Sequence, residues 1–114
     1  MRLHHIAFAA SLVALLGACA IADAKTPAQR VYAIEAQLVP LQRSVLAYIQ
    51  QPGTDLAVKR RLQEVEKTAR EAVEAASIAV QKGDDPTVPA LITGAADAVS
   101  ALATEFTADS EASK

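Results

Sequence analysis

Apolar residues recur every three or four positions along the chain after residue 25, which is the spacing of helices with one apolar face. The first such stripe consists of Val31, Ile34, Leu38, Leu41, Val45 and Tyr48, and it is widened by Leu46 and Ile49. It follows the sequence TPAQ, in which Thr26 suits an N-cap and Gln29 its capping-box partner. Pro52 and Gly53 then break the pattern. We therefore predict a helix over about 27–50.

Pro40 lies inside this stripe. A proline removes one backbone hydrogen bond of a helix and crowds the carbonyl four residues earlier, here that of Ala36. The stripe nevertheless stays in phase from Leu38 to Leu41. We therefore predict one kinked helix and not two.

Two further stripes predict two further helices. The second, over about 55–82, carries Val58, Leu62, Val65, Ala69, Ala72 or Val73, Ala76 and Val80. The third, over about 86–106, carries Val88, Leu91, Ile92, Ala95, Val99, Leu102 and Phe106. It starts near Asp85-Pro86, or at Thr87 if Pro89 takes the first turn. Thr54 or Asp55 can cap the second helix, and Lys82 with Gly83 is a good stop signal. Residues 107–114 carry no further stripe, so we expect a disordered tail.

Short connections between helices of this length make neighbours antiparallel. The sequence therefore predicts an all-α fold, an antiparallel up-down-up three-helix bundle over residues 26–106, with alanines that permit a thin core. Self-association is the competing architecture, because the stripes repeat at heptad spacing. The segment lengths and clear helix breakers favour the closed bundle.

The N-terminus has a different pattern, typical of an export signal. Arg2 precedes an apolar run from Ile6 to Leu16, in which Ser11 is the one polar residue, and small residues follow. Extended to Ala22, the run has 17 residues, the lower edge of a bilayer span, so an uncleaved anchor is the alternative.

The chain's single cysteine ends this region in the sequence LGAC, residues 16–19. This sequence resembles the lipobox of bacterial lipoprotein precursors. The resemblance implies that the Cys19 thiol receives a diacylglycerol and that a lipoprotein signal peptidase cuts between Ala18 and Cys19. Residues 1–18 would then be the signal peptide and 19–25 a linker. Ala20, where inner-membrane lipoproteins of enterobacteria carry Asp, implies an outer-membrane lipoprotein facing the periplasm.

Ordinary signal peptidase offers a second interpretation of the same region. The sequences ACA, residues 18–20, and ADA, residues 22–24, both fit its small-x-small pattern. Cleavage there would release a soluble periplasmic helical module, such as an inhibitor or another binding protein. We favour the lipoprotein, because an unpaired cysteine in an exported chain otherwise lacks a purpose.

Little in the sequence can carry catalysis. Both histidines, His4 and His5, precede the expected cleavage point, and there is no tryptophan. The mature chain would therefore have no histidine, so it could form neither a histidine-containing catalytic triad, nor a histidine metal site, nor a haem attachment site. Four carboxylates cluster on the predicted second helix: Glu64, Glu66, Glu71 and Glu74. Their spacing from Lys67 and Arg70 is typical of a solvated, ion-paired helix face. We expect no enzymatic activity, no metal and no cofactor.

The densest run of one charge is Lys59-Arg60-Arg61. Contact with anionic lipid or cell-wall polymer is one interpretation, and an ordinary exposed face is the other. A net charge of −2 gives no indication of nucleic-acid binding. Tyr48 belongs to the first stripe and should be buried with its hydroxyl solvated, whereas Tyr32 lies off the stripe.

Two weaker resemblances complete the picture. The sequence TPAQRVYAIEAQL is similar to a loose group of short exported helical proteins of bacterial and prophage genomes, which implies no particular activity. The last residue, Lys114, resembles the lysine through which an abundant enterobacterial lipoprotein is linked to peptidoglycan, although the Tyr-Arg that precedes that lysine is absent. The sequence as a whole predicts a small lipid-anchored envelope protein, a non-catalytic binding or scaffolding module whose partner is an envelope protein or peptidoglycan.

Overall fold

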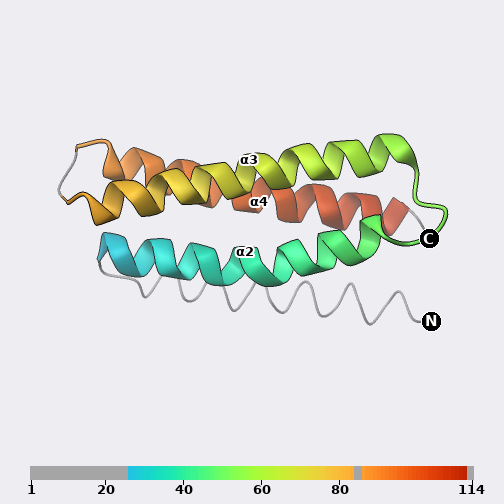
Figure 1. Cartoon of the computed structure of the whole chain (residues 1–114), viewed down its shortest axis with the longest axis horizontal. Coiled ribbons are helices and arrows are strands. Elements are labelled where there is room, and N and C mark those ends of the chain that lie inside the picture. Colours follow the sequence, from blue (N-terminus) through green and yellow to red (C-terminus); the bar gives the residue numbers. More distant parts are fainter. Residues whose placement is uncertain (1–25, 84–85, 113–114) are drawn as a thin grey trace.

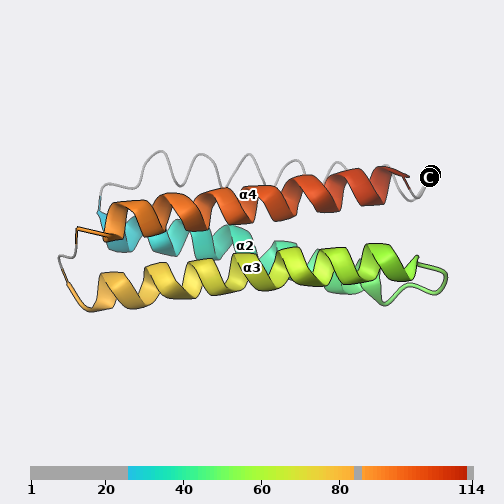
Figure 2. The same cartoon turned by 90° about the horizontal axis from the view of Figure 1, so that it is seen from above.

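A computed structural model of the chain describes residues 26–83 and 86–112, whose regular structure is entirely helical. It comprises α2 (Pro27–Ile49), α3 (Leu56–Gln81) and α4 (Val88–Ala112). The three helices lie side by side along a body that measures 47 × 26 × 16 Å (Figure 1 and Figure 2). For the described residues, the prediction of an all-α fold with three helices is therefore confirmed.

The start of α2 has the predicted capping box. The backbone N–H of Gln29 donates to Thr26 Oγ1 at 3.1 Å, and the backbone N–H of Thr26 donates to Gln29 Oε1 at 3.3 Å. Pro27 takes the first helical position, where its missing N–H removes no helical bond. Pro40 lies inside α2 without ending it, as predicted.

The link from α2 to α3 is a tight turn with local hydrogen bonds. Gly53 has a φ of +87°, a conformation that suits glycine because it has no Cβ. Thr54 Oγ1 donates to the Tyr48 carbonyl at 3.0 Å. Asp55 then caps α3, since its Oδ1 accepts from the Ala57 backbone N–H at 2.7 Å. At its other end α3 stops at Lys82 and Gly83, as the sequence predicts.

Helix α4 takes the later of its two predicted starts and runs past its predicted end at residue 106. The Leu91 N–H donates to the Thr87 carbonyl at 3.0 Å, so the helix starts just after Thr87 and Pro89 falls in its first turn. At the other end α4 continues to Ala112, and the expectation of a disordered tail from residue 107 is wrong for residues 107–112. The reason is Asp109, a buried polar residue that α2 and α3 both hold by hydrogen bonds.

The core is built from the predicted stripes. Ile34, Leu62 and Leu102 are the largest fully buried side chains, one from each helix. Around them lie Val31, Leu38, Val45, Ala69, Val73, Ala76, Val88, Ile92, Ala95, Val99 and Phe106. Small residues in this set bring helix backbones close together, and α3 and α4 make the most extensive contact of any pair. Ala33, which lies off the predicted stripe, is buried as well.

Candidate binding surfaces

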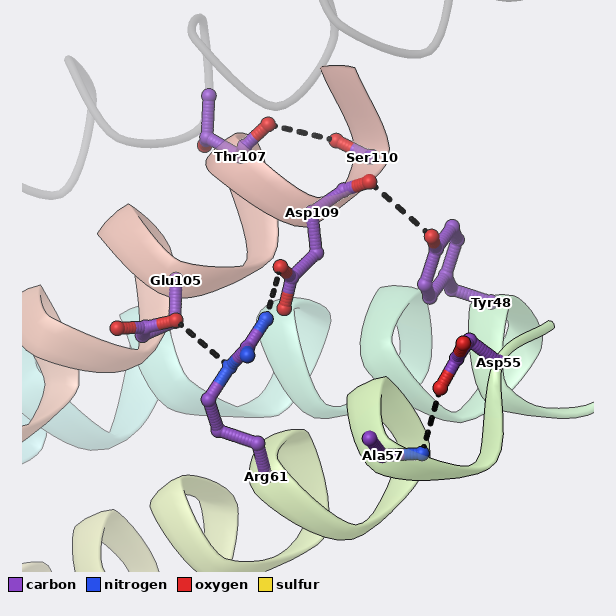
Figure 3. Close-up of polar contacts among 8 residues, drawn as sticks. All are labelled: Tyr48, Asp55, Ala57, Arg61, Glu105, Thr107, Asp109 and Ser110. Carbon is purple, nitrogen blue, oxygen red and sulfur yellow. Dashed lines mark hydrogen bonds and ion pairs between the residues drawn. The ribbon is translucent and has the colours of Figure 1, made fainter. Parts of the chain in front are cut away.

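Four polar and aromatic residues from three helices meet at one end of the bundle (Figure 3). Arg61 of α3 donates to Asp109 Oδ1 of α4, and its Nε lies 3.2 Å from Glu105 Oε2. Tyr48 of α2 is half-buried and donates through its hydroxyl to the Asp109 backbone carbonyl at 3.1 Å, so this hydroxyl is bound within the bundle and not simply solvated as predicted. The Tyr48 ring meets Phe106 edge-on, with ring centroids 6.0 Å apart. This cluster of Tyr48, Arg61, Glu105 and Asp109 ties the last turns of α4 to the other two helices.

The burial of Asp109 indicates that this cluster holds the helices together. Asp109 is only 8 % exposed, and a buried carboxylate requires a cation or hydrogen-bond donors. The Arg61 guanidinium meets that requirement while keeping about half of its side chain in solvent. Ion pairing of this kind fixes the positions of the helices that it joins.

Because Arg61 is paired within the chain, the three residues of the predicted basic run, 59–61, have different surroundings. Arg61 binds acidic residues of its own chain, whereas Arg60 is exposed and Lys59 is half-buried. Neither Lys59 nor Arg60 makes an ion pair with another described residue. A surface for anionic polymer would therefore rest on two cations and not on three.

A shallow groove of about 470 Å³ runs between α2 and α3. Its apolar lining comes from Leu38, Val73 and the exposed Ile78. Its polar lining consists of Glu35, Gln42, Arg70, Glu74, Ser77 and Gln81. Near one end Gln42 Nε2 donates to Glu66 Oε1 at 2.8 Å, which links the two helices across the groove.

A second open groove, of about 510 Å³, lies where α2 begins and α3 ends. Apolar residues and prolines form most of its lining: Pro27, Ala28, Val80, Pro86, Val88 and Pro89, with Thr26 and Gly83. No acidic or basic side chain lines it. The groove lies beside the point at which the expected linker, residues 19–25, enters the bundle.

The carboxylates of α3 behave as the sequence predicts for an ion-paired face. Arg70 lies 3.8 Å from Glu66, and Lys67 lies 4.0 Å from Glu71, both pairs one helical turn apart. Among residues 26–83 and 86–112, no group of three or more His, Cys, Asp or Glu side chains is placed to hold a metal ion.

Exposed apolar side chains gather on the outer side of α2, a feature that the sequence analysis did not single out. Tyr32, Val39 and Leu46 are 74 %, 46 % and 55 % exposed. Tyr32 alone was expected to lie off the stripe, and its exposure agrees with that prediction. The prediction that Leu46 widens the buried stripe is wrong, because Leu46 lies on the outer side of α2, whereas Ile49 packs against the core. The signal that could have found Val39 and Leu46 is their spacing of seven residues from each other and from Tyr32.

Three of the residues that the sequence suggests as functional lie beyond the part of the chain that the structure describes. Ala18, Cys19 and Lys114 lie outside the described residues. No helix within the described ranges is both long enough and apolar enough to span a membrane. Comparison with protein-family models, curated proteins and solved structures gives no match, so the function of this chain must be inferred from its own residues.

Proposed function

We propose that this chain is a small lipid-anchored protein of the bacterial envelope, whose helical bundle is a non-catalytic binding or scaffolding module. The observation that carries the proposal is the sequence LGAC at residues 16–19, which follows an apolar run of signal-peptide length. The single cysteine of the chain lies at the one position where a lipoprotein needs it. Several acyl chains on one residue give stable membrane attachment.

The position of the bundle relative to Cys19 supports this assignment. Thr26, which caps α2, lies seven residues after Cys19 in the sequence. An extended chain of that length reaches at most about 25 Å, which holds the bundle close to the membrane surface. A short leader and a compact domain are what a tethered module requires.

We also propose that the three helices form an antiparallel up-down-up bundle. Its support is the polar cluster, in which the last turn of α2, the second turn of α3 and the last turns of α4 meet. In an up-down-up bundle, Lys59 and Arg60 lie at the end of the bundle that is remote from Thr26. It also places the start of α2 and the end of α4 at opposite ends.

The proposed location is the outer membrane, with the bundle facing the periplasm. It rests on Ala20, the residue after Cys19, by resemblance to the sorting rules of enterobacteria. Attachment of Lys114 to peptidoglycan would make the protein a tether between membrane and wall. An upright bundle suits that role, because its two chain ends leave in opposite directions.

A soluble periplasmic module remains the second candidate, and the sequences ACA and ADA favour it. A fractionation experiment separates the two. We expect the wild-type chain to incorporate labelled palmitate and to stay with membranes after a high-salt wash. Cys19→Ala should lose the label and move to the soluble periplasm. Ala24→Leu, which disrupts ADA and leaves LGAC intact, serves as the matched control and should change neither result. A Cys19→Ala protein that stays with membranes would contradict the lipid anchor.

A further inference from the structure

The outer side of α2 carries a straight line of apolar residues. Tyr32, Val39 and Leu46 are each seven residues apart, and seven residues fall only about 20° short of two full helical turns. The line is therefore about 21 Å long. Ala36, which is also exposed, lies between the first two members. None of these residues contributes to the core of the bundle.

Two opposite charges flank the centre of this line. Glu35 lies one turn before Val39, and Arg43 lies one turn after it. Glu35 is half-buried and Arg43 is exposed. Neither makes an ion pair with another described residue, although the neighbouring helix α3 has two such pairs along its surface. Their charges are therefore available to a second molecule.

The arrangement is self-complementary when the helix is reversed. Turning α2 end over end about Val39 exchanges the places of Glu35 and Arg43. The same rotation exchanges Tyr32 and Leu46, which lie seven residues before and seven residues after Val39. A surface that matches its own reversed copy is the requirement for an interface with two-fold symmetry.

We propose that a second copy of this chain docks on α2 in the antiparallel direction, with the two-fold axis at Val39. Tyr32 then packs against Leu46 of the partner subunit, and Val39 packs against the partner's Val39. Glu35 faces the partner's Arg43, and Arg43 faces the partner's Glu35. Opposite charges at the rim set the register, while the apolar line is removed from water.

The groove beside α2 extends the docking surface. Glu35 belongs both to the edge of the apolar line and to the lining of the α2–α3 groove. On the far side of that groove, Ile78 of α3 is 44 % exposed. A helix lying along α2 could therefore also reach Ile78 across a groove that has a mainly polar lining. The surface is narrow, so we expect association that depends on protein concentration and not an obligate dimer.

The inference does not rest on the lipid anchor, but it is compatible with one. A two-fold axis perpendicular to the helices keeps both copies of Thr26 at the same height along that axis. If the axis is normal to the membrane, the helices of both copies lie parallel to the bilayer and both linkers reach it. This flat arrangement is an alternative to the upright tether, because an upright antiparallel pair would direct its two Thr26 ends to opposite sides. Two anchored copies would also be concentrated in one plane, which favours a weak interface.

Charge reversal tests the proposal most sharply. The chain with Cys19→Ala, purified in mild detergent, is examined by sedimentation equilibrium over a range of concentrations. Glu35→Arg or Arg43→Glu alone places like charges together and should weaken the dimer about three- to ten-fold. The double variant Glu35→Arg with Arg43→Glu restores opposite charges and should recover most of the lost affinity. A monomer at every concentration, or a double variant no better than the singles, would overturn the proposal.

Val39 provides an independent test. Val39→Asp should abolish association, with helix content and Tm close to those of the parent, because Val39 is 46 % exposed and outside the core. Leu56→Asp is the matched control, since Leu56 is 60 % exposed at the start of α3 and away from the line. In the same background, Val39→Cys should form a disulfide-linked dimer and Leu56→Cys should not. Equal effects at the two positions would contradict docking through α2.

Discussion

Replacement of Leu62 by alanine tests the packing of the bundle. Leu62 lies in the middle of the α3 stripe and is 0 % exposed. Loss of a buried leucine removes its transfer free energy and leaves a cavity, which together cost about 2–4 kcal/mol. At roughly 0.05–0.15 kcal/mol per residue, the described residues have a total stability of about 4–13 kcal/mol. The substitution should therefore remove a large part of the stability.

Thermal unfolding followed by circular dichroism measures the effect. For a domain of this size, each kcal/mol lowers Tm by about 4–8 °C, so a loss near 3 kcal/mol corresponds to a fall of about 12–24 °C. Leu56→Ala is the control in the same helix, because Leu56 is 60 % exposed and its replacement should stay within about 0.5 kcal/mol. An unchanged Tm for Leu62→Ala would place Leu62 on a surface and refute the three-helix packing.

Three further substitutions address the polar parts of the bundle. Asp109→Ala should cost about 1–2 kcal/mol in urea unfolding, since Arg61 loses one of its two acidic partners but keeps Glu105 and its contact with solvent. Amide exchange should rise at the end of α4, and unchanged exchange there would contradict the role of the cluster. Thr26→Ala should cost about 1 kcal/mol through loss of the α2 cap, and Thr26→Ser should restore most of it; an Ala variant as stable as the parent would show that the cap is dispensable. The double change Lys59→Gln with Arg60→Gln should reduce co-sedimentation with purified peptidoglycan or anionic vesicles at low salt, and equal sedimentation would identify the two cations as an ordinary exposed face.

Periodicity in the sequence predicts most of this fold because one buried face per helix is enough to build it. The capping box at Thr26 and the stop at Lys82 and Gly83 are local signals that depend on neighbouring residues alone. The same holds for the ion pairs of α3, whose partners are four residues apart. Pro40 did not mislead the prediction, because the stripe on either side of it keeps one phase.

The end of α4 shows where local signals fail. Asp109 continues the three- and four-residue spacing of Val99, Leu102 and Phe106, yet an aspartate normally argues against a buried position. It is buried because Arg61, 48 residues away in the sequence, supplies the opposite charge. A pairing between two helices at that separation has no signature in a single sequence. The same pairing explains why Lys59-Arg60-Arg61 was interpreted as one basic site.

The surfaces were harder to predict than the core. A buried position is indicated by its place in a stripe, whereas an exposed apolar residue is common on any protein and attracts attention only when others lie beside it. The alignment of Tyr32, Val39 and Leu46 gains meaning once α2 is known to turn its other face to the core.

The central claim is that the mature protein begins at a lipid-modified Cys19. The most direct test is the intact mass of the mature chain purified from bacterial membranes, combined with fragmentation of its first residues. The account predicts a chain that starts at Cys19 and carries a diacylglyceryl group on the sulfur. An unmodified chain that starts at Ile21 or Lys25, after ACA or ADA, would contradict it and identify a soluble periplasmic protein.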